Sequence, residues 1–85
     1  MSGYPPPLVL IEWVDSKGAT NVWEYLDEVE PILPSRCLSV GFLIDDQKMY
    51  KTIAQSLNTK KDNAQVVGRT TIPTCAIVCL RHLKA

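Results

Sequence analysis

The sequence lacks the motifs on which most enzymes and metal sites depend. It contains no Gly-rich phosphate loop, no Gly-x-Ser-x-Gly nucleophile elbow and no His-Glu-x-x-His pair. Its only histidine is His82, and the spacing Cys75-x3-Cys79-x2-His82 would put Cys79 and His82 on opposite sides of a strand. That geometry argues against a zinc site and against a Cys–His nucleophile pair. We therefore predict a protein that is not an enzyme and that binds no metal or cofactor.

Long apolar runs and a signal segment are also missing. No apolar run approaches the ~18 residues of a membrane span, and prolines at positions 5–7 stand where a signal peptide has its apolar helix. The three cysteines, Cys37, Cys75 and Cys79, cannot all pair within one chain, which is typical of a reducing compartment. We expect no membrane insertion, a cytoplasmic location and cysteines that serve as small buried core residues.

The composition that remains is that of one small globular domain spanning residues 1–85. Hydrophobic residues make up 46% and charged residues 21% of its 85 positions, too apolar a balance for a disordered chain. Residues 1–7 are an extended, Pro-rich lead-in. A domain of this size buries only about 60 to 65% of the surface that its unfolded chain exposes, and self-association is a common remedy.

The apolar pattern predicts five strands and one short helix. The strands are expected, with turn residues between them, over residues 8–14, 37–44, 49–57, 66–72 and 76–82. Asn21 and Glu24 have the spacing of a capping box, and apolar residues follow at helical intervals, which predicts a helix over residues 21–30. Pro31 is expected to end that helix.

Two arrangements of these elements fit the sequence. Tight hairpins and a corner at Pro73 favour a small, highly bent, five-stranded antiparallel barrel, since a short sheet hides its edges best by curling. The alternative is an open meander with the acidic helix packed across one face. The first strand is apolar on both faces, for example at Leu10 and Ile11, so its second face needs a cover that another subunit would provide.

Charge is unevenly distributed although the net charge is zero. Residues 1–46 hold eight acids against Lys17 and Arg36, a balance of −6, and residues 47–85 hold seven bases against Asp62, a balance of +6. The two halves either attract each other within one fold or join the acidic segment of one subunit to the basic hairpins of the next. Long nucleic acid is not an expected partner, because the acidic half leaves no broad basic face.

The basic hairpins and two aromatic side chains form the candidate ligand site. Ammonium and guanidinium groups there would bind the phosphates of a small phosphorylated ligand. Aromatic rings beside a polar turn would stack on a base, whereas a tryptophan in an apolar strand, such as Trp13, usually belongs to the core. The candidate binding residues are Lys48, Lys51, Lys60, Lys61, Arg69, Trp23 and Tyr25.

Several short motifs between Leu8 and Leu83 occur together in this chain. They are Glu12-Trp13-Val14-Asp15-Ser16, Trp23, Ser39-Val40-Gly41-Phe42-Leu43-Ile44, Gly68, Ile72-Pro73 and residues 77–83. As a set they resemble a widespread group of small uncharacterised proteins encoded by tailed bacteriophages. The strand pattern is also similar to the Sm-like and SH3-like small β-barrels, several of which form rings, but the chain lacks an Sm RNA-binding motif. The resemblance implies a phage origin and a place in the host cytoplasm.

Two functions are compatible with these features. The first is a non-enzymatic, homo-oligomeric phage protein that interferes with host function or anti-phage defence by sequestering a small phosphorylated nucleotide signal. The alternative is an adaptor or inhibitor that binds a host protein through the acidic helix at residues 21–30 or through an exposed strand edge. An enzyme, which would depend on His82 or Asp45, is the last choice, because turn aspartates usually form local hydrogen bonds.

Overall fold

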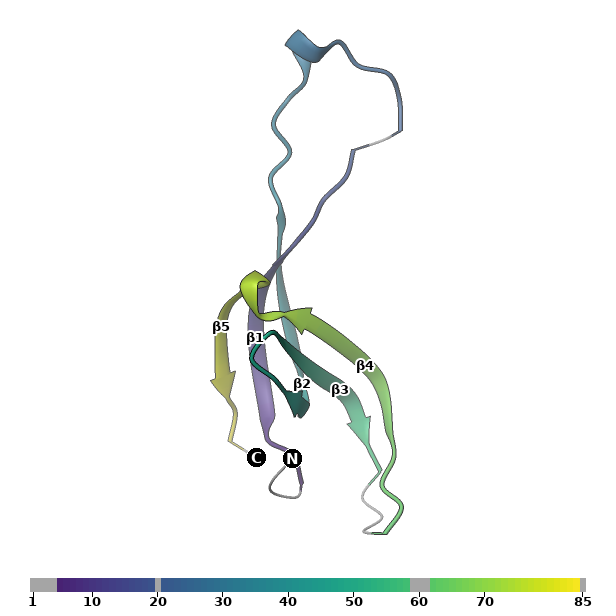
Figure 1. The fold of residues 1–85 in the computed structure, drawn as a ribbon, viewed down its shortest axis with the longest axis vertical. Coiled ribbons are helices and arrows are strands. Elements are labelled where there is room, and N and C mark those ends of the chain that lie inside the picture. The colour runs from purple at the N-terminus through teal and green to yellow at the C-terminus, as the bar shows by residue number, and fades with distance from the viewer. Residues whose placement is uncertain (1–4, 20, 59–61, 85) are drawn as a thin grey trace.

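The structure, a computed structural model, describes residues 5–19, 21–58 and 62–84. Five strands form a single antiparallel sheet (Figure 1). They are β1 (Leu8–Asp15), β2 (Ser35–Asp46), β3 (Tyr50–Leu57), β4 (Val66–Pro73) and β5 (Ile77–His82). The prediction of a mainly β fold with five antiparallel strands is therefore confirmed.

The strand order is β4-β3-β2-β1-β5, so the first strand lies between the second and the last. Leu10 of β1, for example, is opposite Val40 of β2 and Arg81 of β5. A 3-10 turn, η2 (Thr74–Ala76), carries the chain from one edge strand, β4, to the other, β5 (Figure 1). No strand pairing joins β4 to β5 within the described residues. The sheet is bent but open there, so closure into a barrel is not confirmed.

Two irregularities in register help to bend the sheet. The β2–β3 pairing shifts between Leu43 and Asp45, and the β1–β5 pairing shifts between Glu12 and Trp13. An extra residue on one strand of a pair bends that strand and increases its twist. The β2–β3 shift thus lets β3 and β4 curve away from the plane of β1 and β2.

The core lies on one face of this sheet, the inner face. Directly opposite residues of antiparallel strands share a face, so the pairs Leu43–Ile53 and Ile11–Leu80 both point inward. Trp13 packs against this core, as predicted, and its indole Nε1 donates a hydrogen bond to Ser39 Oγ at 3.0 Å. The buried cluster consists of Val9, Ile11, Leu43, Ile53 and Ile72.

The helix predicted over residues 21–30 is not present. Only Leu26–Glu28 form a 3-10 turn, η1, which is closed by a 2.9 Å hydrogen bond to the Tyr25 carbonyl oxygen. Tyr25 and Val29 on either side are extended, with ψ angles of 132° and 137°. A short helix depends on tertiary packing for stability, and all of these residues are exposed. Pro31 further restricts the residue before it to extended conformations.

Two of the three cysteines are exposed, which corrects the prediction that they are buried. All three are free thiols, with Cys37 half-buried and Cys75 and Cys79 exposed. Cys79 is opposite Glu12 and therefore lies on the face of the sheet away from the core. The prediction rested on the general tendency of cysteines to be buried, whereas Cys75 lies in the η2 turn and Cys79 on the uncovered face.

Candidate functional site

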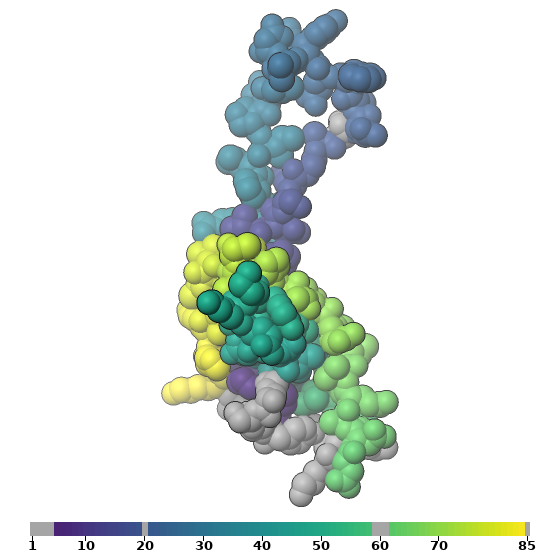
Figure 2. Space-filling view, in the orientation of Figure 1, coloured from purple at the N-terminus to yellow at the C-terminus, as the bar shows by residue number. Residues whose placement is uncertain are grey.

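A long arm leaves the sheet between β1 and β2 (Figures 1 and 2). We call residues 16–34 the arm; residue 20 lies outside the described residues. Its two ends are held together because Asp15, the last residue of β1, pairs with Ser35, the first residue of β2. The molecule measures 59 Å along its long axis and 22 Å across, and the arm, blue in Figure 2, occupies one end. The arm therefore projects well beyond the sheet.

The arm carries a concentration of exposed apolar side chains. Trp23 is fully exposed and Leu26 is 89% exposed. Exposure of Trp23 and Tyr25 agrees with the sequence, which placed both rings beside a polar turn. Large apolar side chains that are concentrated in one exposed segment mark interaction sites more often than singly scattered ones do. The exposed apolar residues of the arm are Val22, Trp23, Tyr25, Leu26, Val29, Ile32 and Leu33.

The arm is also acidic. Its charged residues are Lys17 against four carboxylates, and all five are exposed, which gives the arm a net charge of −3. The four acids alternate with the apolar side chains rather than forming a separate block. They are Glu24, Asp27, Glu28 and Glu30. A partner of the arm therefore has to offer both apolar contacts and positive charge.

The face of the sheet opposite the core, the outer face, is apolar over β1, β2 and β5. Leu10 of β1 lies beside Val40 of β2, and Leu38 of β2 is 70% exposed. A groove of about 310 Å³ crosses this region. It is lined by Leu10, Glu12, Leu38, Cys79 and Arg81. The expectation that the first strand is apolar on both faces is confirmed, and its outer side remains only partly covered.

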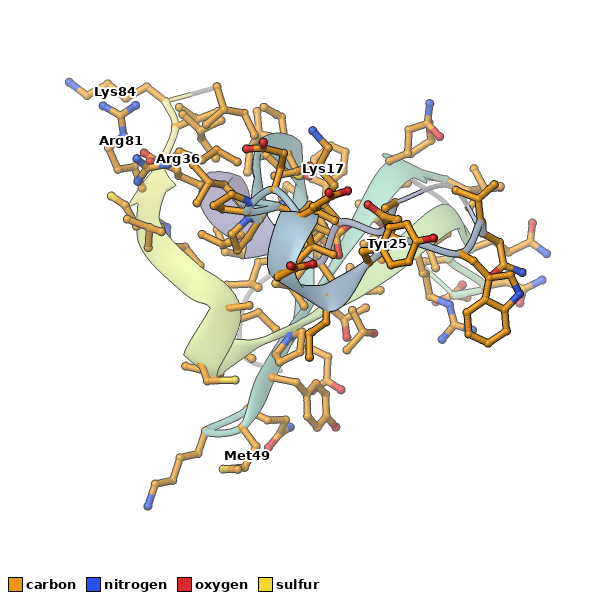
Figure 3. All side chains as sticks on the ribbon, turned by 90° about the horizontal axis from the view of Figure 1, so that it is seen from above. Lys17, Tyr25, Arg36, Met49, Arg81 and Lys84 are labelled. Atoms are coloured by element: carbon orange, nitrogen blue, oxygen red, sulfur yellow. The ribbon has the colours of Figure 1, made fainter. Side chains whose placement is uncertain are left out.

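Two arginines lie at the groove on the outer face, Arg81 in its lining and Arg36 beside Glu12. Arg36 forms an ion pair with Glu12 at 3.0 Å, which neutralises the carboxylate at the groove wall. Viewed from above, Arg36, Arg81 and Lys84 lie toward the β5 side (Figure 3), at different levels along the sheet, since Arg36 is opposite Val14 and Arg81 is opposite Leu10. The outer face thus has the sign of charge opposite to that of the arm.

The structure does not bring the described cations of the predicted ligand site together. Lys51 is opposite the buried Ile72 and points inward. Arg69 is opposite Ala54, which follows the inward-facing Ile53, so Arg69 lies on the outer face. Lys48 is exposed in the β2–β3 turn. Lys60 and Lys61 lie outside the described residues. Trp23 and Tyr25 are in the arm, away from the β3–β4 strands (Figure 1).

The carboxylates of the β2–β3 turn take part in local interactions. Asp45 Oδ1 accepts a 2.7 Å hydrogen bond from Gln47 Nε2, and Asp46 forms an ion pair with Lys51. Lys51 Nζ also donates to the Gln47 carbonyl oxygen at 2.8 Å. Hydrogen bonding by Asp45, and then its negative charge, raises the pKa of Tyr50 above 10.0. These contacts hold the turn together, as expected for turn aspartates.

The last strand separates the residues of the weak metal pattern. His82 is opposite Val9 and faces inward, whereas Cys79 is opposite Glu12 and faces outward, as the sequence predicts for a strand. No group of three or more His, Cys, Asp or Glu side chains is placed to hold a metal ion in the described part of the chain. Over the same residues, no helix is long and apolar enough to cross a bilayer.

Sequence reasoning missed the outer-face groove and half of the arm. The groove residues Leu38 and Cys79 were assigned only to strands, because the sequence did not show which face of each strand is covered. Ile32 and Leu33 were passed over because they lie between Pro31 and Pro34, where neither helix nor strand continues. The available signal was an apolar pair that flanking prolines keep out of regular structure.

Comparisons of this chain with protein-family models, with curated proteins and with solved structures found no match.

Proposed function

We propose that this chain is a non-enzymatic binding protein that acts as a homo-oligomer, with the arm as its docking element. The observation that carries the proposal is the exposure of seven large apolar side chains in residues 16–34, with Trp23 fully exposed. Burying one such side chain is worth about 1.5 to 3 kcal/mol. Burial of the arm in an oligomer would therefore add free energy of stabilisation to that of the small core, a cluster of five buried side chains.

The biological role in this proposal is interference with a host component. The support is the resemblance of the motif set to phage proteins, together with an arm whose mixed apolar and acidic character suits protein recognition. The host cytoplasm is the corresponding location. Docking by the arm, which was the role given to the acidic segment at residues 21–30, does not require that segment to be helical.

Sequestration of a phosphorylated nucleotide is the more demanding form of the proposal. Lys51 and Arg69 lie on opposite faces of the sheet, so a phosphate site would have to combine cations from different subunits. Mass spectrometry of the purified protein under denaturing conditions tests this form. A released phosphorylated compound would support it, and its absence from an intact oligomer would leave protein docking as the function.

In the proposed oligomer, the sheet of each subunit would close into a barrel. The support for an Sm-like or SH3-like barrel is the order β4-β3-β2-β1-β5, in which η2 joins the two edge strands across the end of the sheet. Curling in this way reduces the exposed edge that a short sheet otherwise presents.

The test of self-association compares arm variants with a variant elsewhere on the surface. Trp23→Ala combined with Leu26→Ala removes two large exposed side chains, and we expect an oligomeric wild type to become monomeric in light scattering after size exclusion. Interface anchors contribute about 2 kcal/mol or more each, so loss of the pair, about 4 kcal/mol, should weaken association on the order of 1,000-fold.

Met49→Ala is the matched control for that experiment. Met49 is 74% exposed in the β2–β3 turn and lies outside the arm (Figure 3). Its substitution should leave the oligomer intact. A wild-type protein that is monomeric at all concentrations would contradict the proposed function, as would an oligomer that the arm variant does not weaken.

A further inference from the structure

The arm and the outer face are complementary in polarity. The arm presents exposed apolar side chains such as Trp23, Leu26 and Leu33, and the outer face presents an apolar groove walled by Leu10 and Leu38. Each surface is partly apolar and each is exposed in the single subunit. Contact between the two would remove both from water, which is the dominant favourable contribution to most protein association.

The two surfaces are also complementary in charge. The arm carries a net charge of −3, whereas Arg81 lines the groove and Arg36 stands at its margin, paired with Glu12. Lys84 lies on the same side in the view from above (Figure 3). Opposite charges at the rim of an apolar contact steer association and fix its register.

The arm is not placed to reach the groove of its own subunit. The pairing of Asp15 with Ser35 fixes both ends of the arm at one end of the sheet, and from there the arm extends away along the long axis (Figure 1). The groove lies farther along the sheet, at the level where Leu10 is opposite Arg81. An arm that fits this groove must therefore come from another molecule.

A second copy of the chain is the partner that provides both surfaces at once. When two subunits are related by a two-fold axis, the arm of each reaches the outer face of the other, and two identical contacts form. A stable interface takes about 20 to 30 residues from each side. The arm and the groove of one subunit supply about that many together, and neither does alone.

We propose that the outer face of β5, β1 and β2 is the docking site for the arm of a second copy of this chain, in a reciprocal exchange. The proposal rests on the proposed function, because it names the partner surface of the same arm. It assigns Leu10, Leu38 and Arg81 to the receiving side and Trp23 and Leu26 to the inserted side.

Cross-linking through Cys79 tests this contact, because that native thiol lines the groove. The variant Leu26→Cys is made in a Cys37→Ser, Cys75→Ser background and treated with a short bismaleimide. Because Cys is smaller than Leu and weakens the contact, the reaction is run at a protein concentration at which light scattering shows that this variant is assembled. We expect a covalent dimer on a denaturing gel. Met49→Cys in the same background is the control, and it should remain a monomer on the gel because Met49 is exposed outside the arm.

Removing Cys79 separates the proposal from direct contact between two arms. If Leu26→Cys still gives a covalent dimer after Cys79→Ser, the arms touch each other and the docking site is wrong. If Leu26→Cys with Cys79 gives no covalent dimer while that same variant is an oligomer in light scattering, the docking site is wrong but the proposed function stands. A wild type that is always monomeric overturns both.

Charge exchange provides a second test that needs no cysteine variant. Arg81→Glu should weaken the homo-oligomer by placing a negative charge in the groove, and reversal of the arm by Asp27→Lys and Glu28→Lys should weaken it as well. Mixed together, the two variants should associate at least about tenfold more tightly than either does alone, because each arm then meets a face of opposite charge. If Arg81→Glu alone leaves association unchanged, the groove does not receive the arm.

Discussion

A single glycine allows the close approach of β2 and β3. A Cβ atom at Gly41 would lie 2.8 Å from the Ala54 backbone oxygen and 3.1 Å from Ile53 Cβ. Because both Ile53 and Ala54 are buried, neither neighbour has free space to move into. The absence of a side chain at position 41 is thus a steric requirement for the packing of β2 against β3.

Gly41→Ala is therefore expected to destabilise the fold. Overpacking of a closely packed site costs about 1 to 3 kcal/mol, and here the nearest atom belongs to the backbone. Urea unfolding followed by tryptophan fluorescence, at a fixed protein concentration, measures the change. Gly18→Ala is the control, since nothing lies within 4 Å of its Cβ position. Equal stability of the two variants would contradict this packing argument.

The turn between β2 and β3 is held by polar contacts, whereas the strands beyond it carry the buried Leu43 and Ile53. Asp45, Gln47 and Tyr50 interact on one side of it, and Lys51 joins Asp46 to the Gln47 carbonyl group on the other. Lys51 was expected to bind a phosphate, but its ammonium group already has a carboxylate and a carbonyl partner within its own hairpin. The role of Lys51, near the start of β3, is therefore set by the groups that the fold places beside it.

Asp45→Asn is expected to lower the pKa of Tyr50 toward the ordinary value of 10.0, because hydrogen bonding and negative charge from Asp45 raise it. The raised pKa means that the neutral phenol is favoured in the folded hairpin. That contribution to stability is present below pH ~10 and is lost as the pH rises through the folded-state pKa. The difference between the ultraviolet titrations of wild type and variant at 295 nm isolates Tyr50. Superimposable titrations would show that Asp45 does not act on Tyr50.

Most strands could be predicted from local sequence, and the exceptions have physical causes. The alternation of Leu38, Val40 and Phe42 and the polar turn after it are local signals, and they were enough to predict β2 and the hairpin. β3 accordingly begins at Tyr50, one residue after its predicted start. The helix at residues 21–30 failed because its capping box and apolar spacing had no core to pack against. The distribution of lysines over the two faces depends on strand register, which a single sequence does not specify.

In the whole molecule, apolar surface is divided between a small core and two exposed regions. The core cluster occupies the inner face, whereas the arm and the outer face keep large side chains such as Trp23 and Leu38 in contact with water. The charge of the two halves of the sequence partly matches these two exposed regions. The arm belongs to the half with a balance of −6, whereas Arg81 and Lys84 belong to the half with a balance of +6. The sequence predicted that the second face of the first strand needs a cover, and in the single subunit that face is only partly covered.

The fluorescence of Trp23 over a dilution series tests most directly the claim that the arm is buried by self-association. Trp23 is fully exposed in the single subunit, and its contribution is obtained by subtracting the spectrum of Trp23→Phe, which retains Trp13. We predict that the emission moves to shorter wavelength as concentration rises, in step with the mass measured by sedimentation, because mass action favours the assembled state. A water-exposed emission spectrum that stays constant while the protein assembles would contradict burial of the arm.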